Sequence, residues 1–349
     1  MRVLQIDSGR EWRGGQNQVR LLCRELIGPA GAGLELLLAT QRGSELARRA
    51  AAEGVRVAGL PWRVGLDPRA AWWLRRLVSG FGPDIIHVHD SHALTLARWA
   101  RSWRRSRPRL FAHRRVDFHV RRGSGWFHVD RVVAVSAGVM RVLMADGVPA
   151  PRITVIPDGI DPEEVRVQAS RPVDVRARLR LPPGTPLAVN VAALADHKDH
   201  RTLVRAAGAA RAAAPDLHWA IAGEGAERRS LEAEIARLNL QDRVHLLGYV
   251  DEADALIREG DVFVMSSKEE GLGSVVLHAI ALEKPVVATA AGGLPEVVPE
   301  EWLVPVGDSD ALAGKVVQAL QQVSRTPFPE RFTARAMAAS VLALYRSLA

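Results

Sequence analysis

The sequence contains a single cysteine, Cys23, among 349 residues. One cysteine cannot form an intramolecular disulfide, and it cannot supply the several thiolates of a structural zinc site. Chains without disulfides are typical of reducing compartments, so we expect a cytoplasmic protein. Cys23 lies within a helical pattern, where a free thiol usually serves as a small buried hydrophobic side chain.

Long hydrophobic runs are also missing. No 18 consecutive residues are apolar, so no segment has the pattern of a membrane-spanning helix. The first residues, MRVLQID, have the pattern of a short strand and not that of a signal peptide. We therefore expect a protein that is soluble or is attached peripherally at the inner face of the cytoplasmic membrane.

Lysine is scarce, since only four of the 47 basic residues are lysine and none lies in residues 1–150. That part carries 25 arginines against 12 acidic residues, a balance of +13, whereas residues 151–349 have a balance of −5. Seven of the nine tryptophans also fall in the first part: Trp12, Trp62, Trp72, Trp73, Trp99, Trp103 and Trp126.

A basic part rich in tryptophan favours an anionic partner, such as a membrane surface or a phosphorylated glycolipid. A general preference for arginine in the source proteome explains the same charge equally well. We expect no nucleic-acid partner, because no nucleic-acid-binding motif accompanies the basic residues.

Strand and helix patterns alternate along the whole chain and predict an α/β fold with parallel sheets. Strand patterns of the first half end at ITVIP, and turn residues between PDGID and PPGTP precede a second set. We predict two Rossmann-like domains, 1–163 and 164–326, and a helix in 327–349 that packs back toward the N-terminal domain. Ligands of such sheets bind at the carboxyl ends of the strands, which we expect to face a central cleft.

The clearest chemical pattern lies in residues 266–298, SSKEEGLGSVVLHAIALEKPVVATAAGGLPEVV. A strand ends at SS, and a helix is predicted to begin near Gly273 or Ser274. Its free N–H groups suit a phosphate, and Gly271 and Gly273 allow the backbone to approach a ligand closely. Glu270 would lie beside this anion site and accept hydrogen bonds from sugar hydroxyls. Taken alone, the segment fits a plain turn with a solvated glutamate equally well.

In context, this segment resembles the signature of retaining glycosyltransferases of the GT-B fold, specifically glycosyltransferase family 4 (group 1). A glutamate, Gly-Leu-Gly, a proline-led strand and a GGLPE turn follow one another in the order of that signature. Further matches occur along nearly the whole chain: WRGGQNQV, PDIIHVHDSHA, AHRRVDF, DRVVAVSAGV, ITVIPDGID, HKDHRTLVRAA, IAGEGAERRSL, VHLLGYV and LVPVGDSDALA. Their common order and spacing make the resemblance more specific than any one motif.

The resemblance implies a nucleotide-sugar donor, a UDP-sugar by default, that is bound mainly by the C-terminal domain. It implies no cofactor and no metal, because basic side chains and helix termini stabilise the leaving diphosphate. Glu270 matches the glutamate that contacts the donor sugar, and Lys198 matches the phosphate-binding lysine. Backbone groups match the rest of the donor site: a glycine loop at Gly14 and Gly15, a base-reading strand end at Gly248 and Tyr249, and a diphosphate loop at Gly271, Leu272, Gly273 and Ser274.

Two positions depart from the family pattern. His278 stands where the family has a second glutamate, whose carboxylate grips the ribose hydroxyls. An imidazole nitrogen makes one hydrogen bond and cannot bridge two vicinal hydroxyls as a carboxylate does. Ala193 stands where the family often has an arginine, so one cation facing the phosphates is absent or is supplied elsewhere.

In the N-terminal half, His113 ends the strand pattern RLFAHR and matches the family histidine that faces the donor sugar. We expect it to bind a sugar hydroxyl or to stabilise positive charge on the ring; outside the resemblance, it reads as an ordinary strand-end histidine. His89, Asp90 and His92 follow another strand and are expected to line the acceptor side. His87 and His89 form an H-x-H pattern that, together with Asp90 and His92, could instead be read as a metal site, although no further ligand cluster accompanies it. Outside that reading, we expect His87 to be buried within its strand.

We therefore predict a retaining, metal-independent glycosyltransferase that transfers to a cell-envelope saccharide or glycolipid. A nucleotide-sugar epimerase or hydrolase of the same fold is one alternative. A donor-binding pseudoenzyme is another, because His278 and Ala193 depart from the family pattern. A metal-dependent hydrolase is the alternative with the least support.

Overall fold

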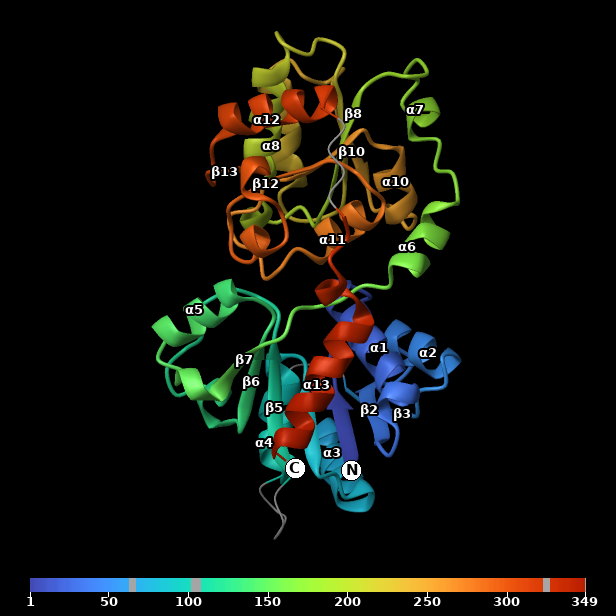
Figure 1. Cartoon of the computed structure of the whole chain (residues 1–349), viewed down its shortest axis with the longest axis vertical. Helices are drawn as coiled ribbons and strands as arrows, with labels where there is room; N and C mark the ends of the chain where they lie inside the picture. The colour runs from blue at the N-terminus through green and yellow to red at the C-terminus, as the bar shows by residue number, and fades with distance from the viewer. Residues whose placement is uncertain (63–66, 102–107, 323–326, 349) are drawn as a thin grey trace. The chain divides into compact units, whose positions relative to one another are not determined.

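The computed structural model describes residues 1–62, 67–101, 108–322 and 327–348, so Trp103 and part of the arginine-rich run lie outside the described residues. The chain divides into two compact units (Figure 1). Unit 1 comprises Met1–Ile160 together with Glu330–Ala349, and unit 2 comprises Asp161–Pro329. Each unit contains its own parallel sheet, as the alternation of strand and helix patterns predicts.

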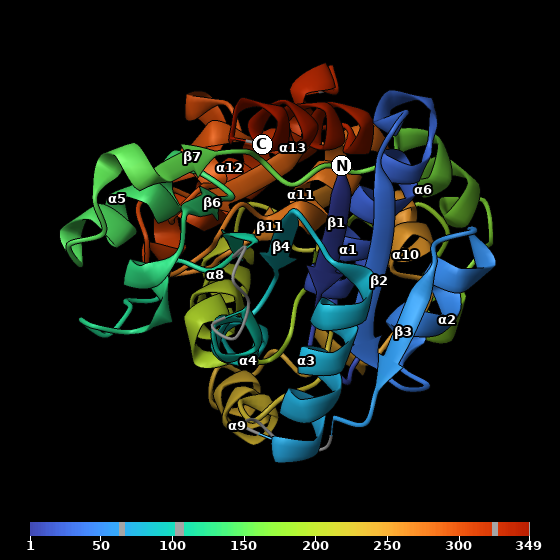
Figure 2. The ribbon, with the colours of Figure 1, turned by 90° about the horizontal axis from the view of Figure 1, so that it is seen from below.

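Unit 1 contains a seven-stranded sheet in the order β3-β2-β1-β4-β5-β6-β7, and Figure 2 shows β3, β2 and β1 side by side. The strands are β1 (Arg2–Ile6), β2 (Glu35–Gln41), β3 (Val57–Leu60), β4 (Ile85–Val88), β5 (Arg109–Arg114), β6 (Arg131–Ala134) and β7 (Ile153–Val155). Every pair is parallel. Strand order reverses between β1 and β4, and such a switch point is where open α/β sheets bind ligands.

The α-helices of unit 1 are α1 (Gly14–Ile27), α2 (Glu45–Ala52), α3 (Pro68–Phe81), α4 (Ser91–Arg101), α5 (Ala137–Ala145) and α13 (Ala334–Leu348). Four 3-10 turns complete it: η1 (Pro29–Gly31), η2 (Gly125–His128), η3 (Ala150–Arg152) and η7 (Glu330–Phe332). The bounds of α3 follow from local chemistry. Asp67 accepts hydrogen bonds from the first N–H groups, Pro68 occupies the first position, and Gly82 ends the helix with φ 61°.

Helix α13 belongs to unit 1 although it follows unit 2 in the sequence. It packs against α1 over the sheet (Figure 1), and its apolar face joins the core that includes Leu22 and Phe111. Tyr345 is fully buried there, and its hydroxyl accepts a hydrogen bond of 2.9 Å from the Gln5 side chain of β1. The last helix is thus bonded directly to the first strand.

Unit 2 contains a six-stranded sheet in the order β10-β9-β8-β11-β12-β13, again with every pair parallel. The strands are β8 (Leu187–Val191), β9 (His218–Ala222), β10 (Val244–Gly248), β11 (Val262–Met265), β12 (Val286–Thr289) and β13 (Leu303–Val304). The order reverses between β8 and β11, so the loops that follow these two strands flank the switch point.

The α-helices of unit 2 are α6 (Pro162–Ala169), α7 (Val175–Arg178), α8 (His200–Ala210), α9 (Arg228–Arg237), α10 (Ala253–Glu259), α11 (Ser274–Ala281) and α12 (Ser309–Gln321). Its 3-10 turns are η4 (Asp196–Lys198), η5 (Leu294–Glu296) and η6 (Glu300–Trp302). Among the described residues of both units, no helix combines the length and the apolar character needed to cross a bilayer.

Candidate functional site

The switch point of unit 2 brings together two residues that are 72 positions apart. Lys198 lies in the loop after β8 and Glu270 in the loop after β11. The Lys198 ammonium lies 2.5 Å from Oε2 of Glu270, and the two side chains are only 18% and 13% exposed. An ion pair of this kind keeps two partly buried charges compensated in the absence of a ligand.

Backbone contacts hold both members of this pair. The carbonyl of Lys198 accepts a hydrogen bond of 3.0 Å from the Ser266 hydroxyl at the end of β11. The carbonyl of Glu270 accepts one of 3.0 Å from the N–H of Gly293, in the turn after β12. Ser267 donates a further hydrogen bond of 3.3 Å to the Glu270 carboxylate. The two loops are therefore tied to the sheet and to each other.

Helix α11 begins at Ser274, as the glycine pattern predicts, and no side chain caps its first turn. Gly273 precedes it with φ 86°, and a Cβ atom there would lie 2.7 Å from Cδ2 of Leu294. Glycine is therefore required by both the backbone conformation and the space. The uncapped N–H groups and the helix dipole make this terminus, three residues from Glu270, suited to an anion.

The remaining predicted donor residues of unit 2 lie at strand ends. Gly248 ends β10 with φ 75°, and the Tyr249 side chain beside it is 67% exposed. Ala193 is exposed after β8, so its methyl group offers no charge at that position.

His278 is half-buried on α11, and its side chain has an acidic partner. Nδ1 of His278 lies 2.6 Å from Oδ1 of Asp254, in the first turn of α10. The sequence alone did not indicate this pairing. Asp254 is therefore a residue that our sequence analysis missed, and it acquires interest only through the fold.

The switch point of unit 1 is built from two carboxylates, Asp7 after β1 and Asp90 after β4. Asp90 bonds the Ser8 hydroxyl at 2.6 Å and the Ser8 N–H at 2.7 Å. Asp90 also accepts hydrogen bonds from the N–H groups of His92 and Ala93 in the first turn of α4. Burial and the nearby charge of Asp90 raise the pKa of Asp7 to about 6.

Three buried histidines, His87, His89 and His113, form a cluster on β4 and β5 and just beyond β4, which we call the histidine cluster. Burial lowers the pKa of His87 to about 3, and burial likewise holds the pKa values of His89 and His113 well below the usual range. All three rings are therefore neutral at neutral pH. The burial of His87 within its strand was predicted from the sequence, and the structure confirms it.

Arg115 determines the tautomers of two of these rings. Its guanidinium donates to Nδ1 of His89 at 3.0 Å and to Nδ1 of His113 at 3.3 Å. A guanidinium only donates, so both rings carry their proton on Nε2. Arg115 also donates to the buried carboxylate of Asp158 at 2.9 Å. Sequence analysis missed Arg115 and Asp158 as individual residues, although both lie inside quoted family motifs.

The histidine cluster bears on the metal alternative. Its candidate ligand atoms all lie within 4.8 Å of one another. However, the Arg115 guanidinium already donates hydrogen bonds to two of the three rings, so a metal cation would have to displace this positive charge. The set predicted from the sequence adds Asp90 and His92 to His87 and His89, but Asp90 is engaged as a helix cap and His92 is exposed. We therefore disfavour a metal ion in either set.

Gly14 and Gly15 are the first two residues of α1. Beyond the chain neighbours and the backbone of α1 itself, a Cβ atom at either position would meet no atom of the described residues within 4 Å, and neither residue has a positive φ. Contacts with the described residues therefore do not require glycine there. A ligand that approaches this backbone closely would also require glycine. The predicted role of the loop in the donor site stays a prediction.

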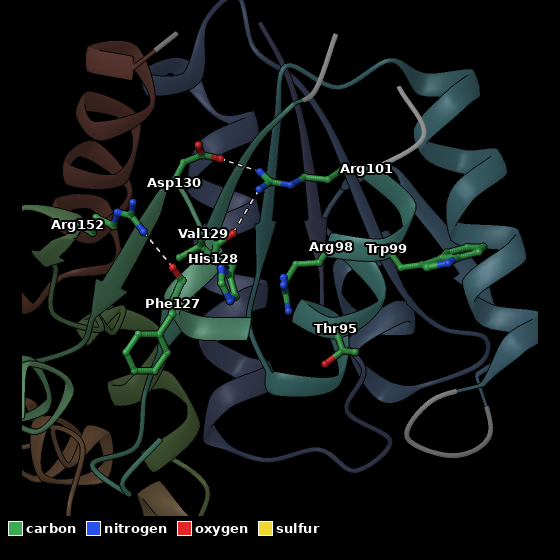
Figure 3. Close-up of a pocket in the computed structure, with 9 residues that line it drawn as sticks. All are labelled: Thr95, Arg98, Trp99, Arg101, Phe127, His128, Val129, Asp130 and Arg152. Carbon is green, nitrogen blue, oxygen red and sulfur yellow. Dashed lines mark hydrogen bonds and ion pairs between the residues drawn. The ribbon is translucent and has the colours of Figure 1, made fainter. Parts of the chain in front are cut away.

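Unit 1 also has an open pocket of about 670 Å³ at the amino ends of β6 and β7 (Figure 3). Its lining is basic and aromatic: Thr95, Arg98, Trp99, Arg101, Phe127, His128, Val129, Asp130 and Arg152. Arg101 is paired with Asp130 at 2.7 Å, whereas Arg98 has no hydrogen bond or ion pair with any described residue. The pocket lies at the sheet edge opposite to the switch point, so it is separate from the predicted site.

Comparison with known families covers both units. The model described as "Glycosyl transferases group 1" matches residues 174–337, and the model described as "Glycosyltransferase Family 4" matches residues 12–164. Among solved structures, Anabaena Alr3699/HepE in complex with UDP-glucose has a TM-score of 0.81 at 18% identity, with 100% of both chains covered. Sucrose-phosphate synthase from Thermosynechococcus elongatus has a TM-score of 0.77 at 25% identity, covering 99% of this chain and 98% of that one.

These matches define the class as GT-B. The chain belongs to the group 1 (family 4) glycosyltransferases, as its motifs predict. One relative is a 2-deoxystreptamine glucosyltransferase of Streptomyces kanamyceticus, 29% identical over 70% of this chain and 60% of its own length. Another is the lipopolysaccharide core biosynthesis glycosyltransferase LpsE of Rhizobium meliloti, 31% identical over 45% of this chain and 46% of its own length. The chain thus spans about half to three fifths of the length of these two relatives.

Proposed function

We propose that this protein transfers a sugar from a nucleoside-diphosphate sugar, by default a UDP-sugar, to a hydroxyl of a cell-envelope saccharide or glycolipid. The observation that carries the proposal is the pair of Lys198 and Glu270, which lies next to the uncapped start of α11 at the switch point of unit 2. A cation and free N–H groups suit a diphosphate, and a carboxylate suits sugar hydroxyls.

In this proposal the ion pair opens when the donor binds. The diphosphate takes over Lys198 and the N–H groups of α11, and Glu270 is released to accept hydrogen bonds from the donor sugar. After binding, Lys198 faces the diphosphate and the Glu270 carboxylate accepts hydrogen bonds from hydroxyls, so neither partly buried charge is left without a partner. For unit 1, we propose that the exposed His92 contacts the acceptor directly. His89, Asp90 and His113 are buried or bonded to neighbouring groups, so each would contact a substrate only after a local rearrangement.

The chemical step proposed is transfer with retention. The acceptor oxygen bonds to the anomeric carbon on the face from which the diphosphate departs, while the bond from that carbon to the phosphate oxygen breaks. The leaving phosphate oxygen takes the acceptor proton, so no strong protein base, metal or cofactor is needed. The protein contributes positioning and stabilisation of the negative charge that develops on the diphosphate.

Similar proteins support the donor and acceptor classes. The structure of Anabaena Alr3699/HepE contains UDP-glucose, and the relatives include proteins named for glucosyl transfer and for lipopolysaccharide core biosynthesis. Their names describe those proteins, and we carry over only the chemical class of the substrates.

The test is an assay of the purified protein with UDP-, GDP- and ADP-sugars, with and without a saccharide or glycolipid extract as acceptor. Transfer requires product that contains the donor sugar and depends on the acceptor. Turnover of donor without acceptor would indicate an epimerase or hydrolase instead. Tight donor binding without any turnover would indicate a pseudoenzyme, and loss of activity with a chelator would contradict metal independence.

A further inference from the structure

Two neighbouring helices of unit 1, α3 and α4, carry all the exposed tryptophans that the structure describes. Eight of the nine tryptophans lie among the described residues, and the exposed ones are Trp72 (48%), Trp73 (46%) and Trp99 (41%). The first two belong to α3 and the third to α4, and the two helices pack against each other. Exposed indole rings are therefore concentrated on one part of the molecule.

The same two helices are positively charged. Together they contain five arginines and no acidic residue. Exposed arginines elsewhere in unit 1 have carboxylate partners on their own helix, as Arg48 has Glu45 in α2. In contrast, Arg69, Arg76 and Arg98 form no ion pair with any described residue. Their charge is uncompensated within the described part of the chain, so it attracts an anionic partner.

The helical repeat of α3 explains why its tryptophans stay on the surface. Leu74 and Val78 are buried on the side that faces the core, whereas Trp72 and Arg76 lie one turn apart on the other side. The Arg76 guanidinium lies over the Trp72 ring, 4.9 Å from its centroid, and the Trp73 ring meets Trp72 edge-on with centroids 5.2 Å apart. The indole rings thus contact each other and an arginine instead of the core.

The basic side chains continue from α3 to α4. Figure 2 shows the two helices side by side, on the side of the sheet away from α13. Figure 3 shows Arg98 and Trp99 extending from α4 at the rim of the basic pocket. We call the three exposed tryptophans together with Arg69, Arg76 and Arg98 the α3–α4 surface.

We infer that the α3–α4 surface docks on an anionic lipid bilayer, with its indole rings at the boundary between headgroups and acyl chains and its arginines on the lipid phosphates. An indole has an apolar body and a polar N–H, and an arginine has an apolar stem below its charge, so both suit this boundary. The α3–α4 surface is separate from the proposed donor site, and the inference does not depend on the proposed function.

A second copy of the chain fits the α3–α4 surface less well than a bilayer does. A two-fold interface would place this surface against itself, because the same patch is used on both copies. Arginine would then face arginine, and neither α3 nor α4 offers a carboxylate to compensate the charge. Lipid phosphates supply that negative charge.

The experiment measures flotation of the full chain with lipid vesicles. One set contains phosphatidylglycerol and phosphatidylcholine in equal parts, and the other contains phosphatidylcholine alone. We expect binding to the anionic vesicles to be at least about tenfold tighter at low salt, and to weaken as salt is added. Bromine atoms on the acyl chains should quench part of the tryptophan fluorescence, since they reach only indoles that enter the bilayer.

Two double variants separate the contributions. Trp72→Ser with Trp73→Ser should weaken binding about tenfold and remove most of the quenching, with little change in melting temperature because both side chains are exposed. Arg69→Gln with Arg76→Gln should weaken binding about tenfold at low salt and much less at high salt. The control is Val167→Ser, which removes an exposed apolar side chain from α6 of unit 2 and should change neither measurement.

Three outcomes would overturn the inference. The first is equal binding of the wild type to both kinds of vesicle, and the second is unchanged binding and quenching in the tryptophan variant. The third is a dimer in the absence of lipid that the tryptophan variant converts to a monomer, because the surface would then join two copies. UDP binding by calorimetry should be the same in the tryptophan variant and the wild type, so failure of the lipid inference is distinguishable from failure of the proposed function.

Discussion

The two units have the same switch-point topology but use it differently. In unit 1 the loops beyond β1 and β4 are bonded to each other through Asp90 and Ser8, and the histidine cluster beside them is buried and bonded to Arg115. In unit 2 the corresponding loops carry two ion pairs, the partly buried pair of Lys198 with Glu270 and the exposed pair of Lys268 with Asp196. Unit 1 therefore uses these polar residues to fix its own loops, whereas the Lys198–Glu270 pair of unit 2 is the one that the proposed function opens for a ligand.

The largest effect that would test this contrast is on activity. We expect Glu270→Ala and Lys198→Ala each to lower sugar transfer about 100- to 1,000-fold, because the proposed function assigns the sugar hydroxyls to Glu270 and the developing negative charge to Lys198. Steady-state transfer rates and thermal melting of the variants check this. The control is Lys268→Ala, since Lys268 forms a well-exposed pair with Asp196 in the same two loops. If both variants transfer sugar at the wild-type rate, this ion pair is not part of the site.

The next effect concerns the stability of unit 1. Arg115→Met leaves the buried carboxylate of Asp158 without its cation, and we expect unfolding free energy to fall by about 3 kcal/mol. Burial already raises the pKa of Asp158, and Arg115 opposes that rise. Because the folded-state pKa then lies further above the unfolded value, the variant should lose more stability as pH rises and recover some on acidification.

Denaturant unfolding at several pH values, followed by hydrogen exchange in β5 and β7, measures this loss. Arg48→Met is the control, because Arg48 forms an exposed ion pair with Glu45 in the same unit. Equal stability of Arg115→Met and the wild type would show that the buried charges do not hold the histidine cluster together.

An effect of at most the same size, and of the opposite sign, is expected at Asp7. Its pKa of about 6 lies above the unfolded value of 3.8, so ionisation costs stability as pH rises between these values. Asp7→Asn should therefore raise the unfolding free energy by up to about 3 kcal/mol above pH 6, and the gain should vanish near pH 4. Hydrogen exchange of β1 across this pH range checks the sign. Glu35→Gln, at a half-exposed carboxylate on β2, gives the baseline, and a gain independent of pH would contradict the assignment.

The smallest effect tests whether the charge contrast between the units has a partner. We propose that the basic pocket of unit 1 contacts anionic lipid, so Arg98→Gln and Arg152→Gln should each weaken binding to vesicles of phosphatidylglycerol by about fivefold at low salt. Arg258→Gln, at an exposed arginine of unit 2, should leave binding unchanged. If wild-type protein does not sediment with these vesicles, the arginine excess of unit 1 has another cause.

The sequence predicts the local structure well, because the signals for it are local. The alternation of strand and helix patterns predicts the parallel sheets of both units, and the glycines predict a helix that begins near Gly273 or Ser274, where α11 begins at Ser274. The pairing of Lys198 with Glu270 joins two residues that were each predicted, but their contact required the order of β8 and β11 in the sheet. No spacing pattern in the sequence indicates that contact.

The residues that sequence analysis missed are all joined over long separations. Asp254 lies 24 positions from His278, and Arg115 lies 43 positions from Asp158. Each is an ordinary charged residue in its own segment and gains its role only from a partner on another element. His278 itself was noticed because it departs from a family pattern, whereas Asp254 departs from none.

The return of α13 to unit 1 has a consequence for biosynthesis. Tyr345 lies 340 positions after Gln5, and its hydroxyl bonds both Gln5 and Nδ1 of the buried His87. While the ribosome is still translating unit 2, the sheet of unit 1 lacks the helix that covers part of its core, and these polar groups lack their partner. Unit 2 is encoded without interruption and can fold first, although it emerges second. The N-terminal half of the chain is therefore the last to be completed.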